Sequence, residues 1–515
     1  MIAYVNILIM NNRFKFLVYL ACFLFLISSC KKEEAELPEI PPVITGLESE
    51  YYVVVKEALL LKPTIENKVD SIVWVVNGQR VANALQYNFQ APAAPGAYNL
   101  VVMAYNKGNI SQKVIQITTG RYVNWQTTTN TILAIDASQK FAGKNEVKWE
   151  VLSAPSELYR LSAGTALTAQ FTTVNRGTYQ LKVSSGDLVD TLLITVRQAE
   201  RAQSPFIAKV FDYLPAPGQF VNELPKYSAG DTYETMIAKA GKELVGEDAN
   251  LITLGGWGGY VVVGFDHTIV NVAGRRDFRI YGNAFGANSN PRPNAPFGGS
   301  CEPGVVMVAY DKNKNGKPDE DEWYEIKGSG NFSAESEPWY TAAVSNKVDV
   351  RTFRNYEMTY DRPTVETPGT PQGHISIGNY IRWTDNQGQQ GYKIKNTYHA
   401  QSYYPAWVKE DKLTYKGVRL AQNGLEESGQ GSYYVLYAYR YGYVDNYPNN
   451  HDNAGIDIDW AIDKNGNRVN LPGIDFVKVY TGVDQENGWL GEASTEVGRG
   501  EDLHLLGTNI TTINQ

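Results

Sequence analysis

The chain has 515 residues, 43% of them hydrophobic, and a formal net charge of −8 at pH 7. This length predicts several domains, each able to bury an ordinary hydrophobic core. The acidic balance argues against nucleic acid as a partner, because phosphate backbones are bound by clustered lysine and arginine.

The N-terminus has the order of a secretory signal. Arg13 and Lys15 precede an apolar run of about a dozen residues, and two serines then lead to Cys30. A basic segment, a short apolar segment and small residues are typical of a signal peptide. The pattern resembles a bacterial lipobox, so we expect residues 1–29 to be removed and Cys30 to carry lipid. The alternative is a plain secreted protein in which Cys30 is incidental.

Residues 30–42 form the predicted tether. The run Lys31-Lys32-Glu33-Glu34 resembles the charged export tag of Bacteroidota lipoproteins that reach the outer face of the outer membrane. Charge and proline then favour an extended linker. The resemblance therefore implies a lipid-anchored protein on the cell surface. Because Cys22 belongs to the signal and Cys30 would be acylated, only Cys301 remains and no intrachain disulfide is predicted.

Two successive segments, 43–120 and 121–198, show the same order of strand patterns. Each has an apolar strand with a central tryptophan, followed by a Gly-x-Tyr strand, and these residues are Trp74 and Tyr98, then Trp149 and Tyr179. A buried tryptophan on a central strand is typical of an immunoglobulin-like sandwich. The segments resemble the PKD and Ig-like modules of bacterial surface proteins. We expect them to be spacers, with ligand binding as the alternative.

Residues 199–515 are predicted to form one long β-rich region. Tyrosine and glycine are frequent, and short apolar runs alternate with turn residues, as in strands. The best helical period lies at 231–244, where Asp231 stands at the start as a candidate cap. We expect one helix there.

The segment 311–322 has the spacing of a calcium loop. Gly316 stands at the sixth position, where the chain must turn sharply, and oxygen-bearing residues occupy positions 1, 3, 5, 9 and 12. The flanking residues read as strands, so the loop would close a β-hairpin. The alternative is a turn-rich hairpin without metal. The predicted Ca²⁺ ligands are Asp311, Asn313, Asn315, Asp319 and Glu322 through side-chain oxygens and Lys317 through its carbonyl.

A second acidic segment provides the only catalytic hypothesis. Asp457 and Asp459 would share one face of a strand, and paired carboxylates perform acid and base catalysis in glycosidases. With Glu492, they define the alternative of a carbohydrate-active hydrolase. A solvent-facing or structural metal role is the other interpretation. No further catalytic motif supports an enzyme, and we expect none of these residues to be catalytic.

Aromatic residues supply the predicted ligand surface. A row of rings on one strand face can stack on sugar rings or on a flat macrocycle. The same residues could instead form a tyrosine-rich core. The candidates are Trp257, Tyr403, Tyr404, Trp407, Tyr439, Tyr441 and Tyr443.

Several motifs in the C-terminal region occur in a fixed order. They are GGWGG from 255, DFRIYGN from 277, EPGVVMV from 302 and GIDFVKVYTG from 473. In this order they resemble Bacteroidota "cell surface proteins" with PKD-type modules. That resemblance implies a role beside outer-membrane uptake systems, including those for cobalamin.

We therefore predict an all-β chain of two Ig/PKD-like sandwiches followed by a larger jelly-roll-like sandwich. The predicted function is capture of an extracellular nutrient, either a glycan or a corrinoid, with an outer-membrane transporter as a candidate partner. A hydrolase is one alternative, and an adhesin or structural surface protein is the other.

Overall fold

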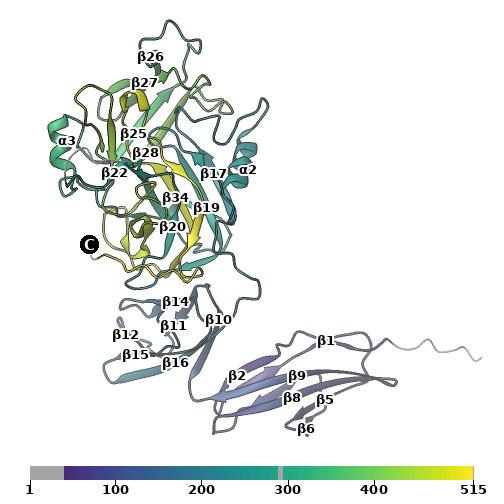
Figure 1. The fold of residues 1–515 in the computed structure, drawn as a ribbon. Helices are drawn as coiled ribbons and strands as arrows, with labels where there is room; N and C mark the ends of the chain where they lie inside the picture. The colour runs from purple at the N-terminus through teal and green to yellow at the C-terminus, as the bar shows by residue number, and fades with distance from the viewer. Residues whose placement is uncertain (1–39, 288–293, 514–515) are drawn as a thin grey trace, which may run out of the picture. The chain divides into compact units, whose positions relative to one another are not determined.

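The computed structural model describes residues 40–287 and 294–513, so the predicted signal peptide and Cys30 lie outside the described residues. The chain divides into two compact units, Met1–Val123 and Asn124–Gln515. Strands make up nearly all of the regular structure (Figure 1). In the described part of the chain, no helix combines the length and the apolar character that crossing a membrane would require.

The first unit is a β-sandwich around Trp74. One sheet has the order β2-β9-β8-β5-β6, and the smaller pairs β1-β4 and β3-β7 complete the sandwich. Trp74 is fully buried, and its indole nitrogen donates to the Ala84 carbonyl at 2.8 Å. The strands are β1 (Val43–Thr45), β2 (Glu50–Val54), β3 (Ala58–Leu61), β4 (Thr64–Glu66), β5 (Ser71–Val76), β6 (Gln79–Ala82), β7 (Tyr87–Gln90), β8 (Gly96–Asn106) and β9 (Asn109–Gly120).

The second unit begins with another sandwich. Its sheets have the orders β10-β16-β15-β12 and β11-β14-β13. Tyr179 is fully buried between them and shares a 2.7 Å hydrogen bond with Thr173, whereas Trp149 is only half-buried. The strands are β10 (Val123–Thr128), β11 (Leu133–Asp136), β12 (Lys148–Ser153), β13 (Tyr159–Ser162), β14 (Thr168–Thr173), β15 (Gly177–Ser185) and β16 (Leu188–Arg197).

The rest of the second unit is a larger β domain around a seven-stranded sheet. Its order is β17-β19-β34-β23-β24-β33, and β31 also pairs with β23. One face of this sheet packs on the main core through valines such as Val263, Val308 and Val477. Smaller antiparallel sheets, among them β27-β26-β25-β28, surround it.

The strands of this domain range from 2 residues in β18 to 11 residues in β19 and β26. They are β17 (Lys209–Leu214), β18 (Ile252–Thr253), β19 (Tyr260–Val270), β20 (Phe278–Ile280), β21 (Phe285–Gly286), β22 (Gly298–Ser300), β23 (Gly304–Ala309), β24 (Trp323–Ile326), β25 (Phe353–Asp361), β26 (Ile375–Asp385), β27 (Gln390–Asn396), β28 (Lys412–Arg419), β29 (Gly424–Glu426), β30 (Tyr434–Tyr437), β31 (Tyr443–Val444), β32 (Gly455–Ile456), β33 (Ala461–Ile462), β34 (Gly473–Thr481), β35 (Glu496–Val497) and β36 (Gly500–Asp502).

The described part of this domain contains two short α-helices. Figure 1 shows them on the outside of the domain. The predicted helix is confirmed as α2 (Tyr233–Leu244), which buries Met236, Ala240 and Leu244 next to β17. Its cap is Thr232 rather than Asp231, because the Thr232 hydroxyl accepts from the backbone of Thr235 at 3.3 Å. The second α-helix is α3 (Tyr340–Asn346), which the sequence did not predict. Short 3₁₀ turns are η1 (Glu320–Glu322), η2 (Asp452–Ala454), η3 (Ile458–Trp460) and η4 (Gly488–Leu490).

A polar joint connects the second sandwich to the larger domain. The Arg160 guanidinium on β13 forks onto both carboxylate oxygens of Asp459, and its Nε donates to Asn470 at 2.9 Å. Nearby, the Thr268 amide donates to the Asn130 carbonyl at 3.1 Å. A bidentate guanidinium–carboxylate pair fixes orientation as well as distance. These contacts lie within the second compact unit, which contains both the second sandwich and the larger domain.

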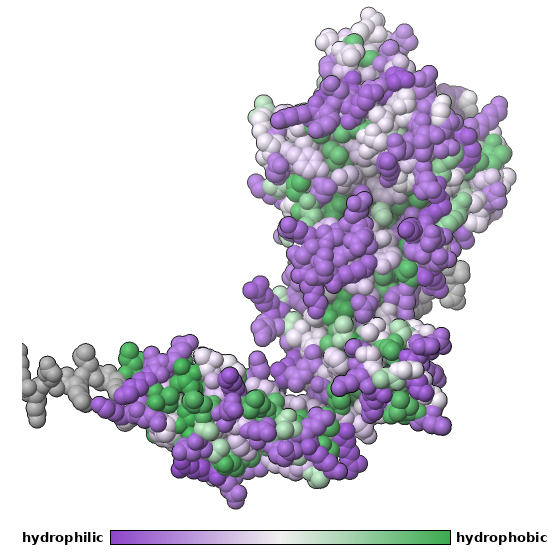
Figure 2. Space-filling view, turned by 180° about the vertical axis from the view of Figure 1, so that it is seen from behind, coloured by the Kyte–Doolittle hydropathy of each residue, from purple (hydrophilic) through white to green (hydrophobic). Residues whose placement is uncertain are grey.

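The predicted fold class is confirmed: two Ig-like sandwiches precede a larger, all-β domain. Figure 2 shows apolar side chains in scattered patches among hydrophilic ones on the face in view. Scattered apolar side chains are ordinary for a soluble surface.

Candidate functional site

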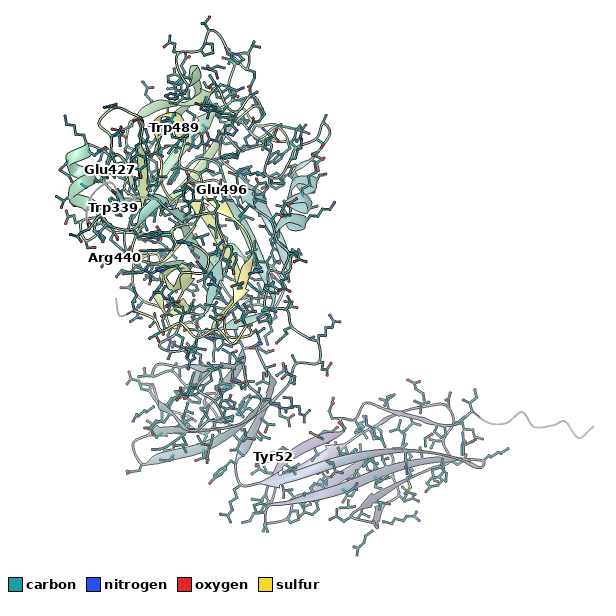
Figure 3. The ribbon with its side chains drawn as sticks, viewed as in Figure 1. Tyr52, Trp339, Glu427, Arg440, Trp489 and Glu496 are labelled. Carbon is teal, nitrogen blue, oxygen red and sulfur yellow. The ribbon has the colours of Figure 1, made fainter. Side chains whose placement is uncertain are left out.

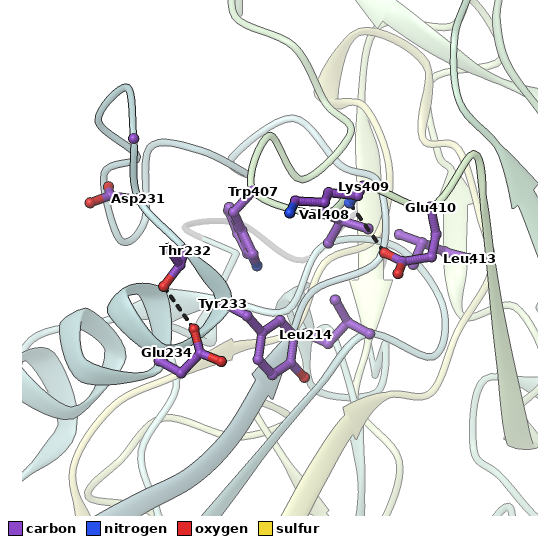
Figure 4. A pocket seen from close by; sticks show the side chains of 11 residues that line it. Leu214, Asp231, Thr232, Tyr233, Glu234, Trp407, Val408, Lys409, Glu410 and Leu413 are labelled. Carbon is purple, nitrogen blue, oxygen red and sulfur yellow. Dashed lines mark hydrogen bonds between the residues drawn. The ribbon is translucent and has the colours of Figure 1, made fainter.

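The pocket in Figure 4 lies where α2 begins, beside the end of β17 and the loop before β28. Its volume is about 780 Å³, within the range of sites for small organic ligands. Leu214, Val408 and Leu413 supply apolar surface, and polar groups stand around them (Figure 4). Apolar walls with few polar groups are typical of ligand sites.

Trp407 gives this pocket its distinctive chemistry. The side chain is only 6% exposed, and among the described residues its indole Nε1 has no hydrogen-bond acceptor. Tyr213 and Tyr227 stack beside the indole at centroid distances of 6.1 and 6.3 Å. Figure 4 shows the indole nitrogen pointing into the pocket. The ring therefore presents its N–H edge, rather than a free face, to a ligand.

The wall opposite Trp407 is held by a carboxylate between two tyrosines. The Tyr233 hydroxyl donates to Asp212 at 2.6 Å, and the Tyr260 hydroxyl donates to its other oxygen at 2.9 Å. Burial first, and then the Asp212 charge, raise the pKa of both phenols above their ordinary value. Both tyrosines are therefore neutral donors, and Tyr233 is fixed as a wall of the pocket.

The rim is polar and charged. The Thr232 hydroxyl donates to Glu234 at 2.8 Å, and the Glu410 carboxylate accepts from the Lys409 amide at 3.1 Å. Lys409 is exposed. A buried donor, apolar walls and a rim of hydroxyl, carboxylate and ammonium groups suit a ligand that is rich in hydroxyl groups. Such an arrangement can bind and orient a ligand.

The other predicted aromatic ligand residues belong to the core, which corrects the sequence interpretation. The hydroxyl or indole groups of five of them form hydrogen bonds inside the domain; Tyr439, for example, donates to the Ala421 carbonyl at 2.6 Å. The Tyr441 ring packs against Trp460 at a centroid distance of 5.1 Å. The predicted single strand also does not form, because β30 ends at Tyr437 and β31 begins at Tyr443. The rings of the buried set are Trp257, Tyr403, Tyr404, Tyr439, Tyr441 and Tyr443, each at most 8% exposed.

The predicted calcium loop closes the β23–β24 hairpin. Asp311 accepts from the amides of Asn315 at 3.0 Å and Gly316 at 2.7 Å, so the first carboxylate folds the loop over itself. Glu322 accepts from the amides of Lys312 at 2.7 Å and Asp319 at 3.1 Å. The loop therefore has the turn and the oxygen-bearing residues that calcium requires. Calcium binding there stays a prediction.

The carboxylates of the hydrolase alternative do not share a strand face. Asp457 caps η3 by accepting from the Asp459 amide at 2.7 Å, and Asp459 is bound by Arg160. Glu492 belongs to a different buried cluster, in which Lys393 lies 3.3 Å from Glu486. The prediction that Asp457 and Asp459 share one face of a strand is therefore wrong.

Three further carboxylates meet inside the domain. Ligand atoms of Glu302, Asp445 and Glu496 all lie within 4.8 Å of one another, and Figure 3 shows Glu496 among the interior strands. Burial, and then the neighbouring carboxylates, raise the pKa of Glu302 to about 8, and burial raises that of Asp445 to about 7. Burial likewise raises the pKa of the Cys301 thiol. Cys301 is therefore an unreactive, buried thiol.

Fold and site define an all-β protein of several sandwiches with a small-ligand pocket in its largest domain. No protein-family model matches the chain, and no curated protein matches it.

Solved structures similar to the chain are immunoglobulin and fibronectin modules. A titin I-band fragment, I67–I69, is 13% identical over 31% of this chain and 66% of its own, with a TM-score of 0.14. Fibronectin(III)-like modules of Clostridium thermocellum CbhA are 16% identical over 31% of this chain and 96% of their own, with a TM-score of 0.16. Sidekick-1 immunoglobulin domains 1–4 cover 47% of this chain and 61% of their own at 10% identity, with a TM-score of 0.14. Similarity at these scores carries no argument about function.

Proposed function

We propose that the protein is a lipid-anchored protein of the outer-membrane surface that captures an extracellular glycan in the pocket beside Trp407. The lipobox-like segment and the charged tag support the location, and the order of C-terminal motifs supports a role beside an uptake system. A transporter in the outer membrane is the partner that such a role requires.

The unpaired N–H of Trp407 carries the proposal. A buried donor without an acceptor is costly, and native proteins rarely leave one without a reason. A ligand oxygen placed at this edge would satisfy the donor. Sugars offer hydroxyl oxygens on a ring with apolar faces, which matches both the polar rim and the apolar walls.

A glycan fits this pocket better than a corrinoid does. Tyr213 and Tyr227 stack beside the Trp407 ring, which is only 6% exposed, so a flat macrocycle finds little free aromatic face on which to stack. Binding of a corrinoid instead of a glycan is one of the outcomes that the titration described next can give.

The test is calorimetric titration of the full chain with a panel of neutral oligosaccharides and with cobalamin. Trp407→Phe removes the N–H and keeps a ring, and we expect it to weaken glycan binding about 10-fold. Trp489, which is 42% exposed and is not among the residues that line this pocket, provides the control Trp489→Phe. Figure 3 labels its position.

Saturable glycan binding that depends on Trp407 but not on Trp489 supports the proposal. Saturable cobalamin binding would move the assignment to a corrinoid. A folded protein that binds neither would contradict small-ligand capture and favour an adhesin or structural role. Turnover of an oligosaccharide would favour the hydrolase.

A further inference from the structure

The outer face of the seven-stranded sheet carries a long groove that is separate from the Trp407 pocket. Three hollows follow one another across it, with volumes of about 380, 780 and 450 Å³. Phe211 lines the first and second hollows, and Lys478 lines the second and third. Neighbouring hollows therefore share a lining residue, and the row of three forms a track that suits a chain-like ligand.

The strand register places Lys478 at the centre of this face. It stands opposite Val262 on β19 and Met307 on β23. The same row continues to Asp212 on one side and Glu325 on the other. Neighbouring side chains of β34 on this face are two residues away, because strand side chains alternate.

Lys478 is a half-buried cation without an ion-pair partner. Among the described residues, no carboxylate lies within 4.0 Å of its ammonium group, which instead lies 4.2 Å from the centre of the Tyr260 ring. The acid whose charge acts on the pKa of Lys478 is Asp212, and Asp212 already accepts hydrogen bonds from the hydroxyls of Tyr233 and Tyr260. Burial lowers the pKa of Lys478. An anion in the groove would compensate this desolvated charge.

Three more lysines line the same part of the track. Lys209 lies 4.4 Å from the centre of the Phe211 ring, and Lys314 and Lys317 extend from the β23–β24 loop that forms one wall. In the described chain none of the three has a carboxylate within ion-pair distance. At the far end, by contrast, Lys416 is paired with Glu357 at 2.8 Å. Unpaired positive charge is therefore concentrated around Lys478.

Aromatic rings alternate with these lysines. Phe211, Tyr260 and Trp323 are all half-buried and line the central hollow. Such rings pack against the apolar faces of sugars, and ammonium groups bind carboxylate or sulfate. Nucleic acid fits less well, because the carboxylates of Asp212 and Glu320 stand among the lysines and the chain is acidic as a whole.

We propose that this groove binds a segment of an acidic polysaccharide, with Lys478 pairing with a carboxylate or sulfate of the sugar. The aromatic rings pack against the sugar rings of the polysaccharide, and the loop lysines contact its neighbouring acidic groups. This site lies outside the Trp407 pocket and does not depend on it.

The test is titration of the full chain with an oligogalacturonate and with its carboxyl-reduced, neutral counterpart. A heparin-derived oligosaccharide distinguishes sulfate from carboxylate as the recognised group, and single-stranded oligothymidylate tests nucleic acid. We expect binding of an acidic oligosaccharide, loss of binding in the neutral counterpart, and weaker binding at high salt.

Lys478→Met keeps the apolar stem and removes the charge, and we expect it to weaken binding at least about 10-fold. Lys464→Met, at an exposed turn, is the matched control and should change binding less than about 2-fold. Lys317→Met, at an exposed loop position, tests the groove even if Lys478→Met folds poorly. Equal binding by wild type and both groove variants would overturn the proposal. The proposal would also be overturned if neither acidic oligosaccharide bound, or if oligothymidylate alone bound.

Discussion

Replacing Trp407 by phenylalanine should lower the free energy of unfolding less than the same replacement at another buried tryptophan of the same domain. Trp257 is fully buried, and its N–H donates to the Val418 carbonyl at 3.2 Å, whereas the Trp407 N–H has no acceptor among the described residues. The two rings therefore offer a matched pair for the substitution Trp→Phe.

The expected magnitudes follow from these contacts. Either substitution costs about 1–2 kcal/mol through lost apolar contact and a small cavity. In Trp257→Phe the loss of the hydrogen bond and the orphaned Val418 carbonyl add about 1–3 kcal/mol. In Trp407→Phe the removal of an unsatisfied donor offsets the packing loss by about 1–3 kcal/mol, so the net change is near zero.

Urea unfolding followed by far-UV circular dichroism measures both free energies of unfolding. We expect Trp257→Phe to lower the free energy of unfolding by at least about 2 kcal/mol more than Trp407→Phe does. An equal loss in the two variants would refute the reasoning, because it would mean that the Trp407 donor is satisfied in the folded protein.

Three other predictions concern charged groups. The raised pKa values of Glu302 (about 8) and Asp445 (about 7) mean that their contribution to stability is complete below the unfolded pKa and is lost as pH rises through 7 to 8. Glu302→Gln should therefore flatten the fall in urea midpoint between about pH 5 and pH 9, and an unchanged pH profile would contradict this. Arg160→Met should cost about 1–2 kcal/mol and increase hydrogen exchange in β13, since it leaves Asp459 unpaired, whereas unchanged exchange would mean that the joint is held elsewhere. Calcium should raise the melting temperature of the wild type but not that of Glu322→Gln, and a wild type indifferent to calcium would count against the loop as a metal site.

Local patterns predicted the local structure well. The apolar period and nearby capping residues located α2, and the Asp-rich loop between two apolar runs located the β23–β24 hairpin. In both cases the residues that decide the structure lie close together in the sequence.

The aromatic surface could not be predicted because burial depends on distant partners. Tyr443, for example, donates to Asn331, a residue more than a hundred positions away, and no local pattern reveals that contact. Of the seven predicted rings, Trp407 alone lines the small-ligand pocket. The lone lysine in the apolar strand Phe476-Val477-Lys478-Val479-Tyr480 was a signal for the sheet groove, because alternation places it opposite the valines that enter the core.

The joint at Arg160 also determines where the protein can be cut for study. A fragment that starts after the second sandwich would expose Asp459, Asn470 and the Tyr310 hydroxyl, all of which that sandwich contacts. It would also remove Asn130, Thr131 and Ile132 from one end of the sheet groove. The second sandwich thus covers a polar surface of the larger domain, and the smallest piece that keeps the native surface begins at Asn124.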